Sequence, residues 1–206
     1  MRILGLISCF LLLTTDVCVK GKKKASGNKP CPNFAHTEFR LPKDVHDIHY
    51  DFLLHPNISK RNFAGDVTIS FAVSKKTKLI VLHASNLKQS SIKATSECSA
   101  KSFWAFTFNK ALKIKDKVEL KMKYDGIIDA TEATGLFLST YKSMTDNRTW
   151  ESVVTQFEPT HARKMLPCFD EPSFKGTFTI SVVHENKHTV RSNMELKDVK
   201  AYKTKE

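Results

Sequence analysis

Residues 184–188 read His-Glu-Asn-Lys-His, which matches the His-Glu-x-x-His pattern of hydrolytic zinc sites. On a helix, this spacing places both imidazoles on one face, where they bind zinc, and the glutamate beside them acts as a general base. Here the flanking residues 178–183 and 189–192 alternate like strands, and Asn186-Lys187 suits a hairpin turn. A hairpin would carry the two histidines onto opposite arms. We therefore predict an accidental match and no metal ligands in this chain.

The second chemically distinctive stretch is residues 155–178, TQFEPTHARKMLPCFDEPSFKGTF, which lies between two strand-like segments. From the residues alone, the simplest interpretation of Glu158 is that it caps the turn at Pro159-Thr160. Arg163, Asp170 and Glu171 are interpreted as structural, because an arginine between two turns and beside acids usually forms an internal salt bridge that fixes the loops.

The elements that must position these residues are strands. Residues 66–73 and 118–124 alternate between apolar and polar side chains, which is typical of half-buried antiparallel strands. Further strands are expected at residues 49–54, 78–83, 102–108, 136–141, 150–156, 178–183 and 189–192. Turn signals separate them at Pro56-Asn57, Ala64-Gly65, Asp125-Gly126, Asp146-Asn147 and Gly176. No stretch has a convincing helical stripe, so the predicted fold is all-β, a large antiparallel sandwich or saddle-shaped assembly of sheets.

The N-terminus is predicted to be a targeting segment. Arg2 gives a basic start, residues 3–13 form an apolar run of signal-peptide length, and Gly21 is a suitable cleavage point. The run is shorter than the roughly 20 apolar residues of a spanning helix, so a cleaved signal is preferred over an uncleaved anchor, and no stable membrane span is expected. The predicted organisation is a signal peptide at 1–21, a basic flexible tail at 22–38 and one β domain at 39–206.

The net charge of +12 could suggest nucleic-acid binding, but the arrangement of the basic residues does not support it. The dense cluster at residues 20–24 lies just after the signal, and the other basic residues alternate along strands as solvated faces. No helix-turn-helix, zinc-finger or aromatic–basic stacking pattern is visible. We expect no nucleic-acid partner. The tail either contacts an acidic surface or glycan, or acts only as a solubilising leader.

Removal of the signal would leave Cys31, Cys98 and Cys168 in an oxidising compartment, where one pair at most forms within the chain. Cys168 lies between two bulky apolar neighbours and is predicted to be a buried free thiol. Pairing of Cys31 with Cys98 stays open, because the sequence does not supply the geometry. Asn57 and Asn147 begin acceptor tripeptides for glycosylation, which secretion would make usable.

Several short motifs, in their order and spacing, resemble a known family. Phe39-Arg40-Leu41-Pro42 is followed by His49-Tyr50-Asp51, then by residues 63–69, 82–84, 135–141 and 155–178, and finally by Ser192-Asn193-Met194. From about Phe39 to Met194, the chain is similar to the N-terminal domain of zinc aminopeptidases of the aminopeptidase N and endoplasmic reticulum aminopeptidase type, which are gluzincins. His161 and Met165-Leu166 depart from the family pattern without touching its Gln-x-Glu.

The resemblance implies that Gln156 and Glu158 form a Gln-x-Glu that reaches into the active site of the next domain. Glu158 would bind the α-ammonium group of a peptide substrate through a charge-assisted hydrogen bond. Gln156 would line the pocket for the first side chain. Zinc, which activates water against the scissile amide, would belong to that next domain. The chain stops before it, so we expect no cofactor here, and peptides with free N-termini as partners only in a full-length context.

Two functions are therefore kept. The first is the N-terminal, substrate-contacting domain of a zinc metalloaminopeptidase that is secreted or in the endoplasmic reticulum lumen, inactive as this chain alone. The alternative is a secreted non-enzymatic binding or decoy protein derived from an aminopeptidase. A small metalloenzyme that uses His184 and His188 is disfavoured by their strand-like flanks.

Overall fold

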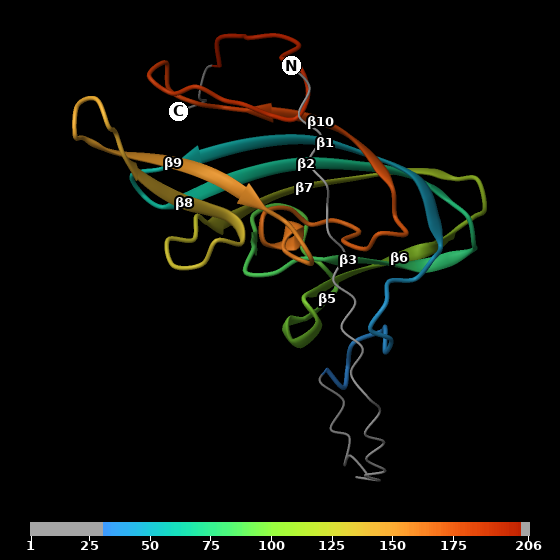
Figure 1. The fold of residues 1–206 in the computed structure, drawn as a ribbon. Helices are drawn as coiled ribbons and strands as arrows, with labels where there is room; N and C mark the ends of the chain where they lie inside the picture. Colours follow the sequence, from blue (N-terminus) through green and yellow to red (C-terminus); the bar gives the residue numbers. More distant parts are fainter. Residues whose placement is uncertain (1–30, 203–206) are drawn as a thin grey trace, which may run out of the picture.

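The computed structural model describes residues 31–202, which form a nearly all-β domain (Figure 1). The expected signal peptide and residues 22–30 of the expected tail lie outside the described residues. The strands are β1 (Val45–Asn57), β2 (Asn62–Val73), β3 (Thr77–His83), β4 (Lys88–Gln89), β5 (Ser96–Cys98), β6 (Phe103–Leu112), β7 (Lys117–Ile127), β8 (Gly135–Lys142), β9 (Thr149–Gln156) and β10 (Gly176–Val182). Two single turns of 3-10 helix, η1 (Ser99–Lys101) and η2 (Ala162–Lys164), interrupt the strands.

The strands form three sheets. A five-stranded sheet has the order β10-β1-β2-β7-β4, a three-stranded sheet has the order β3-β6-β5, and β8 and β9 pair as a hairpin. Figure 1 shows the long curved sheet above the three-stranded sheet, with the hairpin at one end. The predicted all-β class is confirmed. One pairing departs from the antiparallel expectation: β10 lies parallel to β1, because it reaches the sheet through a long connection from β9 instead of a hairpin.

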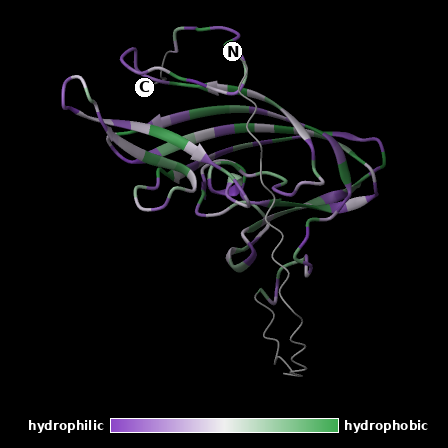
Figure 2. Cartoon of the chain, viewed as in Figure 1, coloured by the Kyte–Doolittle hydropathy of each residue, from purple (hydrophilic) through white to green (hydrophobic). Residues whose placement is uncertain are grey.

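The core lies between the two larger sheets and follows from the period of two in the sequence. On β2, Val67, Ile69, Phe71 and Val73 are buried, whereas the residues between them are partly exposed. Figure 2 shows this alternation of hydrophobic and hydrophilic residues along the long strands. Each fully buried side chain of this size contributes roughly 1.5–3 kcal/mol of stabilising free energy relative to its exposed state. Burial of the apolar face therefore stabilises the strand more than the local conformational preferences of the chain do.

Two glycines that the sequence analysis placed in turns lie inside strands instead. Gly65 pairs with Tyr124 across β2 and β7, and Gly126 pairs with Phe63. A Cβ at Gly65 would lie 2.3 Å from the Tyr124 ring, and a Cβ at Gly126 would lie 2.2 Å from the Phe63 ring. The glycines are thus required by the close approach of an aromatic ring, and the turn predictions at these two positions are wrong.

The predicted strands differ from those of the structure in two further respects. Residues 189–192, expected as a strand, form no strand, while β4 and β5 were not predicted. Both missed strands have three residues or fewer, which is too short to show any periodicity.

A disulfide bond joins Cys31 to Cys98 at the start of the described chain, and Cys168 is a buried free thiol as predicted. Phe34 is buried and stacks on Phe103, with 6.0 Å between the ring centroids. Residues 31–38, which the sequence analysis assigned to the tail, therefore contact the β domain.

We expect the disulfide to stabilise the domain, because it closes a long loop in the unfolded chain: the two cysteines are 67 residues apart. The double variant Cys31→Ser/Cys98→Ser should lose about 2–4 kcal/mol of unfolding free energy in urea titration. A digest of the oxidised protein without reductant should contain one peptide pair linked through these cysteines. Equal stability of the double variant and the parent would contradict this prediction.

Candidate functional site

The candidate site begins where β9 ends. Gln156 is the last residue of β9 and pairs with Gly135, the first residue of β8. Glu158 lies two residues further on, in the loop that leads to β10, so strand alternation does not determine which way its side chain points. Both side chains are exposed. The end of β9 and the loop that follows it therefore present the amide and the carboxylate to solvent, two residues apart.

The carboxylate of Glu158 does not cap its turn. The turn is closed by the backbone, where the N–H of His161 donates to the carbonyl of Phe157 at 2.7 Å. Across residues 31–202, no hydrogen bond or ion pair involves the Glu158 side chain. The turn-capping interpretation is therefore wrong, and the carboxylate is available to an external cation.

An ion pair fixes the loop behind Glu158, as the sequence predicted. Arg163 Nε donates to Asp170 Oδ2 at 2.7 Å, and a second guanidinium N–H donates to the backbone carbonyl of Asp170 at 3.2 Å. The two side chains are only 15% and 14% exposed, so this pair is screened less than a surface pair. Glu171 is structural too: it accepts the backbone N–H of Leu41 at 2.8 Å and lies 3.7 Å from Arg40.

The same loop is anchored to both large sheets. His83 at the end of β3 exchanges two backbone hydrogen bonds with Cys168, at 2.8 and 3.0 Å. On the other side, the hydroxyl of Tyr50 in β1 accepts the N–H of Phe169 at 3.0 Å. Burial raises the pKa of Cys168 well above its usual value, so this thiol stays neutral and acts as a small apolar side chain.

Gly135 brings the hairpin against η2. Its φ of +70° is a left-handed conformation that favours glycine, and a Cβ there would lie 2.6 Å from the Cβ of Lys164. Lys164 in turn contacts Glu132 at 3.0 Å and donates to Thr134 at 2.6 Å. The start of β8, and with it the paired Gln156, is therefore held on the turn that follows Glu158.

A cleft of about 370 Å³ lies beside Glu158 and was not predicted from the sequence. It is lined by Phe39, Arg40, His83, Pro159, Thr160, Arg163, Asp170, Glu171 and Pro172. His83 is 3% exposed, and its Nδ1 has no hydrogen-bond partner within the described residues. Burial, with added repulsion from Arg163 and Arg40, lowers the pKa of His83 from 6.5 to about 3. The only sequence signal for this cleft was the position of His83, a histidine at the end of an apolar strand.

The zinc-like motif is not on a helix. Residues 186 and 187 form a turn that is closed by the N–H of His188 donating to the carbonyl of Glu185 at 2.9 Å. This confirms the predicted turn, but the predicted hairpin is wrong, because residues 189–192 form no strand that could be its second arm. Glu185 pairs with Lys187 at 2.8 Å instead of facing both histidines. Within residues 31–202, no three histidine, cysteine or acidic side chains converge as metal ligands, so these residues do not fit a zinc site.

Both glycosylation acceptors are on the surface. Asn57 ends β1, and its side-chain carbonyl accepts the N–H of Lys60 at 2.9 Å. Asn147 lies in the turn between β8 and β9 with a φ of +61°. Exposed turn positions give a transferase access to both amides, and modification of either stays a prediction.

Comparison with known proteins finds relatives that match most of the β domain. The family model of the peptidase M1 N-terminal domain matches residues 46–206. The chain is 33% identical over 176 residues to endoplasmic reticulum aminopeptidase 2 of Homo sapiens, which covers 78% of this chain and 18% of that protein. It is 32% identical over 171 residues to the thyrotropin-releasing hormone-degrading ectoenzyme of Homo sapiens, with 77% and 16% covered.

A third relative, endoplasmic reticulum aminopeptidase 1 of Homo sapiens, is 30% identical over 206 residues, with 93% of this chain and 22% of that protein covered. The chain thus spans about a fifth of the length of these relatives. The matches confirm the resemblance inferred from the short motifs. Within residues 31–202, no helix has the length and hydrophobicity needed to cross a membrane.

We expect His83 to make the domain sensitive to acid. Its folded-state pKa of about 3 lies below its unfolded value of 6.5, so its contribution is complete above pH 6.5 and is lost as the pH falls towards about 3. The loss should be about 2–4 kcal/mol of unfolding free energy. Urea titrations at about pH 7 and about pH 4 measure the unfolding free energy at each pH. The difference between the two values should be smaller for His83→Phe than for the parent.

The exposed His184 offers the matched control, because His184→Gln also removes a histidine. This variant should keep the pH dependence of the parent. An equal acid sensitivity of His83→Phe and the parent would show that other groups are responsible.

We expect residues 184–188 to bind no zinc, because the turn does not bring both imidazoles and a third ligand together. After dialysis against zinc, the protein and its His184→Ala variant should contain the same amount of metal in elemental analysis, and neither should cleave aminoacyl fluorogenic substrates. One tight zinc per chain that disappears in His184→Ala would overturn this interpretation.

Proposed function

Because the chain belongs to the peptidase M1 family, as its N-terminal domain, we propose that Gln156 and Glu158 contact the N-terminus of peptide substrates in a zinc aminopeptidase of the secretory pathway. The single observation that carries this proposal is the carboxylate of Glu158, which is exposed just after the β8–β9 hairpin and forms no hydrogen bond or ion pair within residues 31–202.

The chemistry of an aminopeptidase requires such a group. An exopeptidase must recognise the free α-amino group, which is a cation at neutral pH, to remove residues from the chain end. A carboxylate that becomes partly desolvated when a substrate and a second protein surface close over it gives a charge-assisted hydrogen bond worth about 1.5–3 kcal/mol. The exposed position of Glu158 leaves it unpaired until that surface and substrate are present.

Gln156 has a different role in this proposal. Its neutral amide can donate and accept hydrogen bonds but cannot neutralise an ammonium group. Since it ends β9 and its backbone pairs with Gly135, its position is set by the hairpin and not by the loop. It would line the pocket for the first side chain of the substrate and influence which residue is preferred there.

The fixed loop supports the precision that such recognition needs. The Arg163–Asp170 pair and the backbone bridge of His83 to Cys168 fix the loop at positions five to twelve residues after Glu158. Groups that are already oriented lose less conformational entropy when a ligand binds. The domain would therefore present the carboxylate with little rearrangement.

The proposal assigns recognition, and not hydrolysis, to these residues. In a zinc aminopeptidase the metal polarises a water molecule for attack on the peptide bond. The described residues do not fit a zinc site, so this chemistry would need ligands from outside residues 31–202.

A secretory location is supported by independent features. The relatives include endoplasmic reticulum aminopeptidases and an ectoenzyme. The Cys31–Cys98 disulfide is the kind of bond that forms in an oxidising compartment, and both acceptor asparagines are exposed. We propose the endoplasmic reticulum lumen or the extracellular space.

A chimera tests the site directly. Residues 31–202 would replace the matching part of human endoplasmic reticulum aminopeptidase 2, and Glu158→Gln would be introduced. Loss of a charge-assisted hydrogen bond of about 1.5–3 kcal/mol should lower kcat/KM for free-amino peptides about ten- to hundred-fold. Gln156→Ala should instead change the order of preference among first residues, with a smaller loss in overall rate.

Glu119→Gln provides the matched control, since the ion pair that this exposed carboxylate on β7 forms among residues 31–202 is with Lys121. It should leave kcat/KM unchanged. Thermal unfolding of the isolated domain should be the same for Glu158→Gln and the parent. A fully active Glu158→Gln chimera, or a domain that this substitution unfolds, would refute the assignment.

A further inference from the structure

A group of lysines gathers at the end of the domain where β2 turns into β3 and β6 turns into β7. Figure 1 shows these two turns at the end of the sheets opposite the β8–β9 hairpin. The sequence analysis treated the basic residues outside the tail as solvated faces of separate strands. The structure instead brings three segments together, residues 43–44, 74–78 and 110–117. Their lysines, which we call the lysine patch, are Lys43, Lys75, Lys76, Lys78, Lys110, Lys113, Lys115 and Lys117.

Backbone hydrogen bonds hold the three segments against one another. The N–H of Val73 donates to the carbonyl of Asp116 at 2.9 Å, and the N–H of Lys115 donates to the carbonyl of Val73 at 2.8 Å. On the other side, the N–H of Ser74 donates to the carbonyl of Asp44 at 2.8 Å. The lysine patch is therefore carried by a fixed backbone that joins three separate parts of the chain, and it is not a run of charge along one strand.

The positive charge of the patch is not neutralised by the rest of the domain. All its lysines are exposed, and none of their ammonium groups forms an ion pair or a hydrogen bond with a residue in the range 31–202. The three segments contain two acids, Asp44 and Asp116, and the carboxylate of Asp116 accepts the backbone N–H of Lys113 at 2.7 Å. Clustered like charges repel and destabilise the folded state, so an anion that lies across the patch would be attracted to it.

The turn between β6 and β7 carries one of these lysines at an unfavourable position. Lys115 has a φ of +72°, a left-handed conformation in which glycine, asparagine and aspartate are the usual residues. A lysine here has a conformational cost that glycine would not have. It places a further positive charge at the turn, beside that of Lys113.

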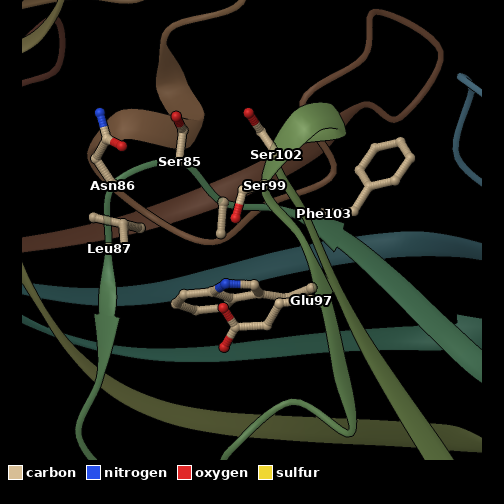
Figure 3. A pocket seen from close by; sticks show the side chains of 9 residues that line it. Ser85, Asn86, Leu87, Glu97, Ser99, Ser102 and Phe103 are labelled. Carbon is tan, nitrogen blue, oxygen red and sulfur yellow. The ribbon is translucent and has the colours of Figure 1, made fainter. Parts of the chain in front are cut away.

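The extent of the patch selects the class of anion. Lys117 begins β7 of the five-stranded sheet, whereas Lys78 and Lys110 belong to β3 and β6 of the three-stranded sheet, so the charge spans both layers. The patch lines neither the cleft beside Glu158 nor the hollow of about 180 Å³ in Figure 3, where the charged side chain is Glu97. A wide charged surface outside both hollows suits a long polymer with many charges better than one small anion.

Other polyanions fit the patch less well. Its three segments contain no aromatic side chain on which nucleic-acid bases could stack. Ile114 is 61% exposed between two of the lysines, but a single apolar side chain is ordinary on a protein surface and too small an area to anchor a membrane. Anionic lipids are concentrated in the cytoplasmic leaflet, which a protein at the proposed secretory location would not meet.

We propose that the lysine patch binds a linear sulfated polysaccharide. Successive sulfate groups of the polymer would lie across both turns and pair with several ammonium groups, which are compact point charges and need no planar partner. The choice of this partner rests on the proposed secretory location. Binding of the polymer requires no peptide substrate, so it is measured independently of the roles proposed for Gln156 and Glu158.

Heparin, a sulfated polysaccharide, is the probe, and its binding to the full chain is measured by isothermal titration calorimetry at about 0.15 M salt. Replacing Lys75, Lys76, Lys113 and Lys115 together by glutamine should weaken binding about tenfold or more, because charge–charge attraction is lost. The matched control replaces Lys60, Lys88, Lys142 and Lys197, four exposed lysines outside the patch, and should stay within about twofold of the parent. Both variants should unfold thermally at or above the temperature of the parent.

The basic cluster at residues 20–24 is the competing site in this chain. Replacing its four lysines by glutamine should weaken heparin binding less than the patch variant does. Hyaluronan, which carries carboxylates but no sulfates, should bind more weakly than heparin. The proposal is overturned if the parent does not bind heparin, if the patch variant and the matched control lose the same affinity, or if the tail variant alone abolishes binding. Tighter binding to phosphatidylserine vesicles than to heparin would assign the patch to a membrane instead.

Discussion

Burial of residues 165–169 between the two larger sheets is the constraint on which the candidate site depends. These five residues are all buried, although they lie in a connection and not in a strand. Phe169 packs edge-to-face on Phe71 of the five-stranded sheet, and Cys168 forms backbone hydrogen bonds with the end of β3. A loop on the surface would leave Glu158 mobile; this one is part of the core and holds it in place.

The ion pair of Arg163 with Asp170 complements that burial. Apolar packing holds the middle of the loop but has little directional preference, whereas the guanidinium and carboxylate meet in one geometry. The cleft beside Glu158 exists because the loop crosses the end of β3 at this point, and it leaves His83 buried without a partner for Nδ1. The same crossing thus fixes the loop that follows Glu158 and buries His83.

The sequence predicted the long strands, the all-β class, the buried thiol and the structural ion pair, because each leaves a local signal: alternation, apolar neighbours, or an arginine beside acids. It did not predict the parallel pairing of β10 or the cleft beside Glu158, because both depend on which distant segments meet. Glu158 shows the limit most clearly. The residues alone favoured a turn cap, and only the backbone closure of that turn by His161 and Phe157 leaves its carboxylate free.

The glycines opposite aromatic rings have a consequence for the alignment of β2 with β7. In a sheet, a shift by one residue turns every side chain to the other face. Such a shift would set the rings of Tyr124 and Phe63 against residues that carry a Cβ, where the present spacing leaves no room. The pairs of Gly65 with Tyr124 and Gly126 with Phe63 therefore exclude neighbouring alignments by steric conflict, and two absent side chains specify the pairing of β2 with β7 in the middle of the sheet.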